Sequence, residues 1–233
     1  MSSDTSSGFE FNVHWLPGMG ADRRLFSKIK VERVVHHYHE WRHLPGAKTL
    51  SDYASWLAEN IDTERNIYIG SSMGGMMATE LMRVKPADHL ILLSAPSGRH
   101  EFPALLKNLS AIRIGRWFSP RQMHALNRMA NTFMGFKNAE DQALFFEMLE
   151  GYGPEFLHFA VNAILEWKPS EFNYPYVQIV GGDDRLFKSD RMRSPIVLPG
   201  AGHFMTWEKP EDLSALIQRE IDHLIETKRS FVR

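Results

Sequence analysis

The apolar positions of this chain fall into short continuous runs that alternate with segments of helical spacing. The short runs predict strands at residues 9–16, 66–70, 90–94, 176–180 and 195–198, and an alternation of bulky and polar residues predicts another at 31–41. The helical spacing predicts helices at residues 49–61, 73–84 and 209–228. Strands that alternate with helices form βαβ units, so we predict an α/β fold with a mostly parallel sheet of about six strands flanked by helices. In such sheets ligands bind at the carboxyl ends of the strands.

One long segment interrupts this alternation. Residues 102–167 have the composition of several helices that are rich in aromatic residues and methionine. We therefore expect a core made of residues 9–96 and 171–233, with residues 97–170 inserted into it. The polar, serine-rich residues 1–8 are expected to form a mobile segment ahead of the core.

The composition is that of a globular protein that can bury a core. The chain has 233 residues, of which 43% are hydrophobic and 24% are charged. A net charge of -1 offers no electrostatic basis for binding nucleic acid or an anionic membrane. The absence of cysteine excludes disulfides, thiolate metal sites and a cysteine nucleophile. We expect a small-molecule partner, and the oligomeric state is left open.

The amino-terminal residues lack the basic and apolar regions of a signal peptide. No apolar run approaches the length that crosses a bilayer. A cytoplasmic location is the expectation that follows.

A candidate nucleophile lies between the strand at 66–70 and the helix at 73–84. Residues 70–74 match G-x-S-x-G, with Ser72 at the central position. A sharp turn from strand to helix would hold this serine in a strained conformation and leave room only for small neighbours. The alternative is a tight packing turn without chemistry. We favour the nucleophile because the motif lies between a predicted strand and a predicted helix.

A serine hydroxyl needs a general base within hydrogen-bond reach, and His203 is our candidate among the eleven histidines. It ends a glycine-containing loop, residues 199–203, which follows the last predicted strand. That position would place the imidazole at the same edge of the sheet as Ser72. The alternative is an ordinary histidine on a surface loop.

The base in turn needs a carboxylate that orients the ring and stabilises the imidazolium. Asp183 and Asp184 both follow the strand at 176–180. We favour Asp184, because a turn beginning at Gly181 would direct it back toward His203. Asp183 is the alternative.

Two backbone N–H groups are candidates for stabilising a developing oxyanion. The N–H of Met73 would lie at the amino terminus of the helix that follows Ser72, where the helix dipole favours negative charge. The loop after the first strand, residues 17–20, would supply the second donor, which we assign to the N–H of Met19. A plain turn that leads into a helix near Asp22 is the alternative for this loop.

With these motifs the sequence resembles the α/β-hydrolase superfamily, and within it the small bacterial branch with a helical cap. The resemblance extends from about Phe9 to the C-terminus and rests on residues 18–20, Ser72, residues 181–184 and residues 202–204. Two departures accompany it. Many relatives have His-Gly in the first loop, where this chain has Pro17 and Gly18, and the two antiparallel strands that often open the fold are expected to be missing or abbreviated here.

The resemblance implies that residues 97–170 form a cap over the site. The aromatic residues of this segment are Phe102, Trp117, Phe118, Phe133, Phe136, Phe145, Phe146, Phe156, Phe159 and Trp167. We expect most of them to pack the cap itself and about a third to line a pocket for an apolar acyl or ring group.

The expected activity is that of a serine hydrolase acting on a small carboxylic ester or related acyl compound, through an acyl-enzyme and without a cofactor. Two alternatives belong to other classes. One is a lyase or C–C bond-cleaving enzyme that uses the same triad, and the other is a non-catalytic protein that binds a ligand in the same fold.

Two other groups of residues are candidates for binding. The histidines at positions 36, 37, 39 and 43 invite a metal hypothesis, but no carboxylate lies at a convincing spacing, so we expect no metal site. Arg23, Arg24 and Arg185 could bind a substrate carboxylate, and we favour solvent exposure or structural pairing for them.

Overall fold

The strands form one six-stranded sheet in which every pairing is parallel, in the order β2-β1-β3-β4-β5-β6. The computed structural model describes residues 11–111, 136, 138–169 and 173–231. The expected mobile segment at residues 1–8 lies outside this range. The strands are β1 (Phe11–Leu16), β2 (Val34–Tyr38), β3 (Asn66–Ser71), β4 (His89–Leu93), β5 (Val177–Gly181) and β6 (Ile196–Leu198).

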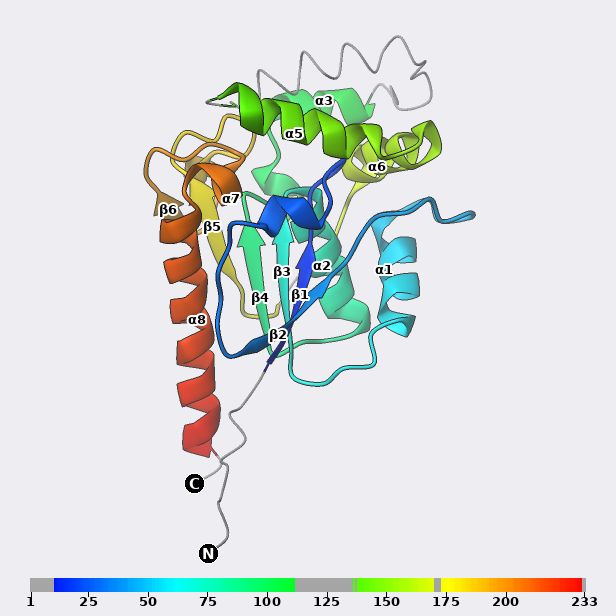
Figure 1. Cartoon of the computed structure of the whole chain (residues 1–233). Coiled ribbons are helices and arrows are strands. Elements are labelled where there is room, and N and C mark those ends of the chain that lie inside the picture. Colours follow the sequence, from blue (N-terminus) through cyan, green and yellow to red (C-terminus); the bar gives the residue numbers. More distant parts are fainter. Residues whose placement is uncertain (1–10, 112–135, 137, 170–172, 232–233) are drawn as a thin grey trace, which may run out of the picture.

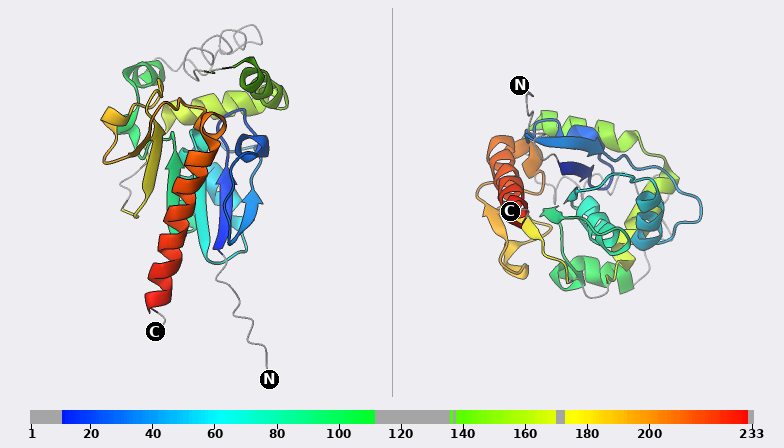
Figure 2. Two further views of the ribbon diagram at one scale, coloured as in Figure 1. Left: turned by 60° about the vertical axis from the view of Figure 1, so that its left-hand side comes forward. Right: turned by 90° about the horizontal axis from the view of Figure 1, so that it is seen from below.

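Helices cover both faces of this sheet (Figures 1 and 2). The α-helices are α1 (Leu50–Glu59), α2 (Met73–Val84), α3 (Ala104–Ala111), α5 (Ala139–Glu150), α6 (Pro154–Glu166), α7 (Met205–Glu208) and α8 (Pro210–Phe231). Short 3-10 helices are η1 (Arg23–Phe26), η2 (Arg99–Glu101) and η4 (Ser189–Arg191). The predicted α/β architecture with about six strands is confirmed.

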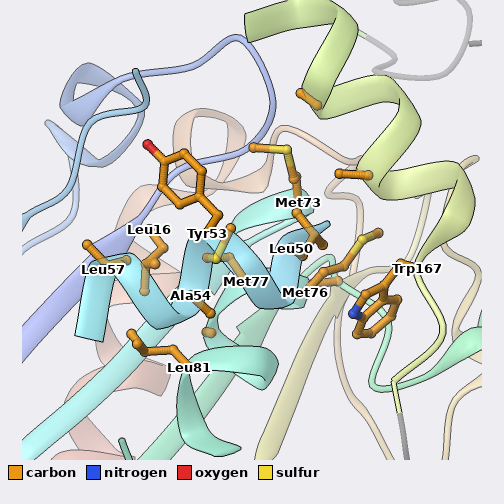
Figure 3. Packing of buried hydrophobic residues seen from close by; sticks show 14 of the residues in the cluster. Leu16, Leu50, Tyr53, Ala54, Leu57, Met73, Met76, Met77, Leu81 and Trp167 are labelled. Carbon is orange, nitrogen blue, oxygen red and sulfur yellow. The ribbon is translucent and has the colours of Figure 1, made fainter. Parts of the chain in front are cut away.

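Alternation along the central strands divides the buried side chains between two cores. In β4, Leu90 and Leu92 face the cluster that includes α1 and α2, whereas Ile91 and Leu93 face the cluster that includes α8. Figure 3 shows part of the first cluster, where Ala54 and Leu57 of α1 and Leu81 of α2 are among the packed residues. Because both faces are covered, the central strands are largely apolar, as buried parallel strands are, with a few buried polar residues such as His14, Asn66 and Gln178.

The helix α1 is capped by Thr49, whose side chain accepts a hydrogen bond from the Asp52 N–H. The Asp52 carboxylate in turn accepts one from the Thr49 N–H at 2.9 Å. This reciprocal capping satisfies N–H groups that have no partner inside a helix. Thr49, the first residue of the predicted helix at 49–61, is therefore the N-cap.

The strand β2 is shorter than the predicted 31–41. Before it, the N–H of Lys30 donates to Ser214 Oγ at 3.0 Å and the N–H of Glu32 donates to Gln218 Oε1 at 2.7 Å. Arg33 then adopts a positive φ of 62°. The segment ahead of Val34 therefore bonds to side chains of α8 instead of pairing with β1.

The helices α3, α5 and α6 lie above the carboxyl ends of the strands (Figure 1). Two buried contacts tie this part of the chain to the sheet layer. Glu101 accepts hydrogen bonds from the N–H of Ser97 at 2.7 Å and from Gln178 Nε2 at 2.7 Å. Trp167 Nε1 donates to Glu80 Oε1 at 2.8 Å. Each contact pairs a buried carboxylate, which would be costly to leave without a partner.

Candidate active site

Ser72 occupies the turn between β3 and α2 in a conformation that is rare for a residue with a side chain. Its φ is 53° and its ψ is -118°. A Cβ at Gly70 would collide with the Gly74 carbonyl, and a Cβ at Gly74 would collide with the carbonyl of Leu16. Both positions therefore require glycine, and the turn lies against the end of β1. Backbone strain of this kind persists where the surrounding structure enforces it.

Met73 is the first residue of α2, which runs for 12 residues. Its N–H is among the first donors of the helix, which have no intrahelical acceptor, and it lies at the positive end of the helix dipole. The predicted donor at position 73 is thus placed directly beside Ser72 in the chain.

The loop after β1 lies beside Ser72. A Cβ built on Gly18 would be 3.5 Å from Ser72 Cβ. The loop closes as a turn in which the N–H of Ala21 donates to the Gly18 carbonyl at 3.2 Å, and Gly20 takes a positive φ of 73°. Met19, the second predicted donor, is the residue between these two glycines. The helix predicted near Asp22 is the 3-10 helix η1, with Asp22 as its cap.

Asp184 and His203 form a buried pair on the loops that follow β5 and β6. Asp184 Oδ2 lies 2.9 Å from His203 Nδ1, and both side chains are almost completely buried. The other carboxylate oxygen, Oδ1, accepts hydrogen bonds from the N–H of Leu186 at 2.8 Å and of Phe187 at 2.9 Å. The structure therefore brings together the histidine and the favoured carboxylate.

The charge on Asp184 is stabilised in this position. Burial alone would raise its pKa, but the attraction of His203 and the hydrogen bonds from His203, Phe187 and Leu186 outweigh burial and lower the pKa below its usual value. An ionised carboxylate at Nδ1 fixes the proton of the neutral imidazole on that nitrogen. It also leaves the opposite nitrogen, Nε2, as an acceptor.

Asp183, the alternative carboxylate, is exposed. Its N–H donates to the Ala201 carbonyl at 2.8 Å, and the N–H of Gly182 donates to the Leu198 carbonyl at 2.9 Å. These bonds hold the loop after β5 against the loop that carries His203. The backbone of residue 183 thus supports the arrangement, while its side chain points to solvent.

His203 Nε2 is buried, and no hydrogen-bond partner reaches it among the residues that the structure describes. A buried nitrogen without a partner is uncommon and calls for an explanation. Ser72, Asp184 and His203 follow β3, β5 and β6, so all three lie at the carboxyl edge of the sheet. A free acceptor at this edge is suited to receive a proton, and such hydrogen bonds often tighten only when substrate is bound.

The helices above the sheet contact both loops of this site. Tyr152, between α5 and α6, donates from its hydroxyl to the Ala21 carbonyl at 2.9 Å. Phe136 and Phe145 pack edge-on against Phe204, which follows His203, with ring centroids 5.3 and 6.1 Å away. Trp117, Phe118 and Phe133, which we had expected among the cap aromatics, lie outside the described residues.

The histidines near β2 are held by hydrogen bonds and stacking. His14 Nδ1 lies 2.9 Å from His39 Nε2, and His37 stacks on His14 with ring centroids 4.7 Å apart. Burial is the main cause that lowers the pKa of His14 to about 3 and that of His39 to about 4. Within the described part of the chain, no group of three or more metal-ligating side chains is arranged to hold an ion.

The arginines differ in their surroundings. Arg24 forms an ion pair with Asp22 at 2.9 Å and another with Glu147 on α5. Arg23 is exposed and lies 3.9 Å from Glu40. Arg185 is exposed. The guanidinium of Arg24 is thus already paired with two carboxylates of the chain, as structural pairing predicts.

Sequence reasoning missed two buried residues that hold loops and strands of the core in place. Trp41 lies in the segment that was predicted as strand, and its indole N–H donates to the Gly18 carbonyl at 3.0 Å. Glu101 is completely buried and organises the chain just after β4. Neither residue lies in a recognisable motif. The Trp41 hydrogen bond joins segments that are distant in sequence, and Glu101 is buried by tertiary packing.

Comparison with known proteins agrees with this architecture. A model of the alpha/beta hydrolase family matches residues 16–216. No curated protein sequence matches the chain significantly. The chain belongs to the alpha/beta hydrolase family.

Solved structures with the same fold are distant in sequence. An esterase from Thermogutta terrifontis with malate bound has a TM-score of 0.73 at 20% identity, covering 93% of this chain and 91% of its own. A lipase-esterase related protein from Clostridium acetobutylicum has a TM-score of 0.66 at 15% identity, with coverage of 89% and 93%. An N-acyl homoserine lactonase in complex with N-butanoyl homoserine has a TM-score of 0.68 at 15% identity, with coverage of 94% and 91%.

No helix in the described residues has the length and apolar character needed to cross a membrane.

Proposed function

We propose that this protein is a serine hydrolase that cleaves small carboxylic esters or related acyl compounds. The observation that carries the proposal is the strained Ser72 at the same sheet edge as the buried pair of Asp184 and His203. Ser72 Oγ attacks the substrate carbonyl while His203 Nε2 takes its proton. Asp184 holds the imidazole and stabilises its charged form.

The tetrahedral intermediate carries its negative charge on the former carbonyl oxygen. The N–H groups of Met73 and Met19 stabilise that oxyanion, and removing one such donor from a serine hydrolase typically costs about 10²- to 10³-fold in kcat. His203 then protonates the leaving group, and the acyl group remains on Ser72. Water, activated by the same histidine, releases the acid and restores the serine. The steps consume one water molecule and otherwise use the side chains and backbone of this chain.

Residues 97–170 act as a cap over this site, with residues 9–96 and 171–233 as the core. The position of α3, α5 and α6 above the strand ends supports this division (Figure 1). The aromatic contacts between α5 and Phe204 support a role for the cap in forming an apolar acyl or ring pocket.

The substrate class follows from the chemistry and from the apolar surroundings. Esterases and a lactonase are among the proteins with similar structures, and the structures of two of them hold malate and N-butanoyl homoserine, respectively. Esters and lactones both present a carbonyl that an activated serine can attack. We assign this chain a small ester with an apolar acyl or ring portion as its substrate.

The test is a panel of p-nitrophenyl esters with acyl chains from acetate to octanoate. We expect turnover by the wild-type protein, and a loss of at least about 10³-fold in Ser72→Ala. Ser71→Ala is the matched control, since Ser71 is the neighbouring serine at the end of β3. Equal turnover by Ser72→Ala and wild type would contradict the proposal.

Mass spectrometry of the quenched reaction separates hydrolysis from the other classes. A mass increase equal to the acyl group, on the peptide that contains Ser72, is the expected result. A C–C bond-cleaving enzyme that uses the triad only as a base would turn over its substrate without this adduct. Ligand binding without turnover across the panel would instead indicate a binding protein.

A further inference from the structure

Trp41 is a buried tryptophan that lies outside the sheet, in the segment between β2 and α1. Its indole N–H donates to the Gly18 carbonyl at 3.0 Å. The Gly18 carbonyl also accepts the N–H of Ala21 at 3.2 Å. Both lone-pair directions of this carbonyl are therefore used, and its orientation is fixed by two donors from different parts of the chain.

The direction of this carbonyl determines the direction of a neighbouring N–H. The carbonyl of Gly18 and the N–H of Met19 belong to one peptide unit, which is trans and planar. In a trans peptide the two groups point in opposite directions. When the carbonyl is held toward Trp41, the Met19 N–H must point away from Trp41. Gly18 itself lies against Ser72, with 3.5 Å between the position of its missing Cβ and Ser72 Cβ.

We propose that Trp41 is a positioning residue for the second oxyanion donor, through its hydrogen bond to the Gly18 carbonyl. The inference rests on the proposed function, because the N–H of Met19 has a catalytic role only if Ser72 forms a tetrahedral intermediate. Preorganised donors contribute most to catalysis when they need not reorient during the reaction. Trp41 supplies this preorganisation without touching the substrate.

The surroundings of Trp41 hold its indole ring in place. Tyr53 of α1 packs edge-on against it with centroids 5.6 Å apart, and Phe156 of α6 stacks on it at 6.4 Å. The Tyr53 hydroxyl is itself fixed by the backbone of Arg42, whose N–H donates to it at 3.1 Å. A ring held from two sides can direct its N–H to one acceptor, which a flexible side chain could not do.

Trp41 also links the peptide between Gly18 and Met19 to the helices above the sheet, because its stacking partner Phe156 belongs to α6. A second contact reaches the same loop from the turn between α5 and α6, where Tyr152 bonds the Ala21 carbonyl. That contact acts on the peptide of Ala21, which is not the unit that carries the Met19 N–H. Loss of the Trp41 hydrogen bond should therefore change the direction of the Met19 N–H, whereas loss of the Tyr152 hydrogen bond should not.

Trp41→Phe tests the inference, since it keeps an aromatic ring and removes the indole N–H. The expected result is a fall in kcat of about tenfold, a fraction of the loss that follows removal of a whole donor. KM should change by less than about twofold, because the donor acts mainly on the transition state. A trifluoromethyl ketone, which forms an oxyanion adduct with an activated serine, should bind more weakly by about the same factor as the fall in kcat/KM.

Trp207→Phe is the matched control. Trp207 donates its indole N–H to the Leu25 carbonyl at 3.0 Å and to the Arg24 carbonyl at 3.2 Å, so the same type of hydrogen bond is removed elsewhere. We expect its kcat and its affinity for the ketone to stay within about twofold of wild type. Equal effects of the two substitutions, or a change in KM alone for Trp41→Phe, would overturn the inference.

Incorporation of benzothienylalanine at position 41 guards against a loss of packing. This residue keeps the size and shape of tryptophan but has no N–H to donate. A tenfold loss of kcat with an unchanged unfolding temperature supports the inference, and full activity contradicts it. If Ser72→Ala kept wild-type turnover, the proposed function would be wrong. If turnover depended on Ser72 but did not change when the indole N–H was removed, only the role of Trp41 would be wrong.

Discussion

Asp184 Oδ2 lies 2.9 Å from His203 Nδ1, and the two side chains are among the most completely buried polar groups in the described part of the chain. Such a pair is costly to bury unless each polar atom is satisfied. The two backbone donors to Asp184 Oδ1 meet that requirement for the carboxylate. His203 Nε2 is left as a buried acceptor at the edge of the sheet where Ser72 lies. An arrangement that satisfies one ring nitrogen and leaves the other without a partner among the described residues is suited to proton transfer.

We predict that Asp184→Asn lowers kcat by about 10³- to 10⁴-fold, with a much smaller change in KM. The amide keeps the shape of the side chain but loses the charge that stabilises the imidazolium, and it can favour the wrong tautomer. Steady-state kinetics with a p-nitrophenyl ester would measure the loss. Asp183→Asn is the matched control and should stay near wild type, because the Asp183 side chain is exposed. The reverse ranking of the two variants would assign the role to Asp183.

The tight approach of the Ser72 turn to β1 has a consequence for stability. A Cβ at position 74 would overlap the carbonyls of Leu16 and Pro17, which belong to the backbone and cannot rotate away. We predict that Gly74→Ala lowers the free energy of unfolding by about 1–3 kcal/mol or more, as overpacking does. Denaturant unfolding measures it.

Gly182→Ala is the control for that substitution. Its Cβ would meet neighbours at 3.5 Å, which is ordinary van der Waals contact. We expect a change in the free energy of unfolding below about 0.5 kcal/mol. A Gly74→Ala protein as stable as Gly182→Ala would show that the turn is not packed as described.

The buried histidine His14 should make the protein less stable in mild acid. Burial, followed by repulsion from His39, lowers the pKa of His14 in the folded protein to about 3, while a histidine in the unfolded chain has a pKa near its ordinary value of 6.5. Below pH 6.5 His14 therefore binds a proton in the unfolded state but not in the folded state. The stabilisation that is complete above pH 6.5 is lost as the pH falls toward 3, by up to about 1.4 kcal/mol per pH unit from this one group.

Urea unfolding at a series of pH values from 7.5 to about 4.5 checks this expectation. His14→Gln should show a smaller loss of stability per pH unit than wild type, whatever its stability at pH 7.5. His158→Gln, at an exposed position, is the control and should keep the wild-type slope. Parallel curves for His14→Gln and wild type would rule out His14 as a source of the pH dependence.

Much of the core could be predicted from sequence because its signals are local. The helix at residues 73–84 has the predicted bounds, since the glycine-rich turn marks its start and Pro86 follows its end. Buried strands such as β3 and β4 are also local, as continuous apolar runs. The short α7 was not predicted, because a helix of 4 residues is too short to show periodicity.

The parts that could not be predicted depend on tertiary contacts. The start of β2 is set by side chains of α8, which lie more than 180 positions further along the chain. The choice between Asp183 and Asp184 depends on which side chain the turn after β5 directs inward. The sequence pattern could favour one of the two residues but could not decide between them. The role of Trp41 could not be predicted for a different reason. It depends on a single hydrogen bond to a backbone atom of another loop.

The central claim is that Ser72 is a nucleophile activated by His203, and covalent labelling tests it most directly. A fluorophosphonate should add once to the wild-type protein, on the peptide that contains Ser72, as read by mass spectrometry. Labelling should be absent in Ser72→Ala, retained in Ser71→Ala, and slowed by at least about 10²-fold in His203→Ala but not in the exposed control His223→Ala. Labelling of His203→Ala at the wild-type rate, or of Ser72→Ala at all, would contradict the account.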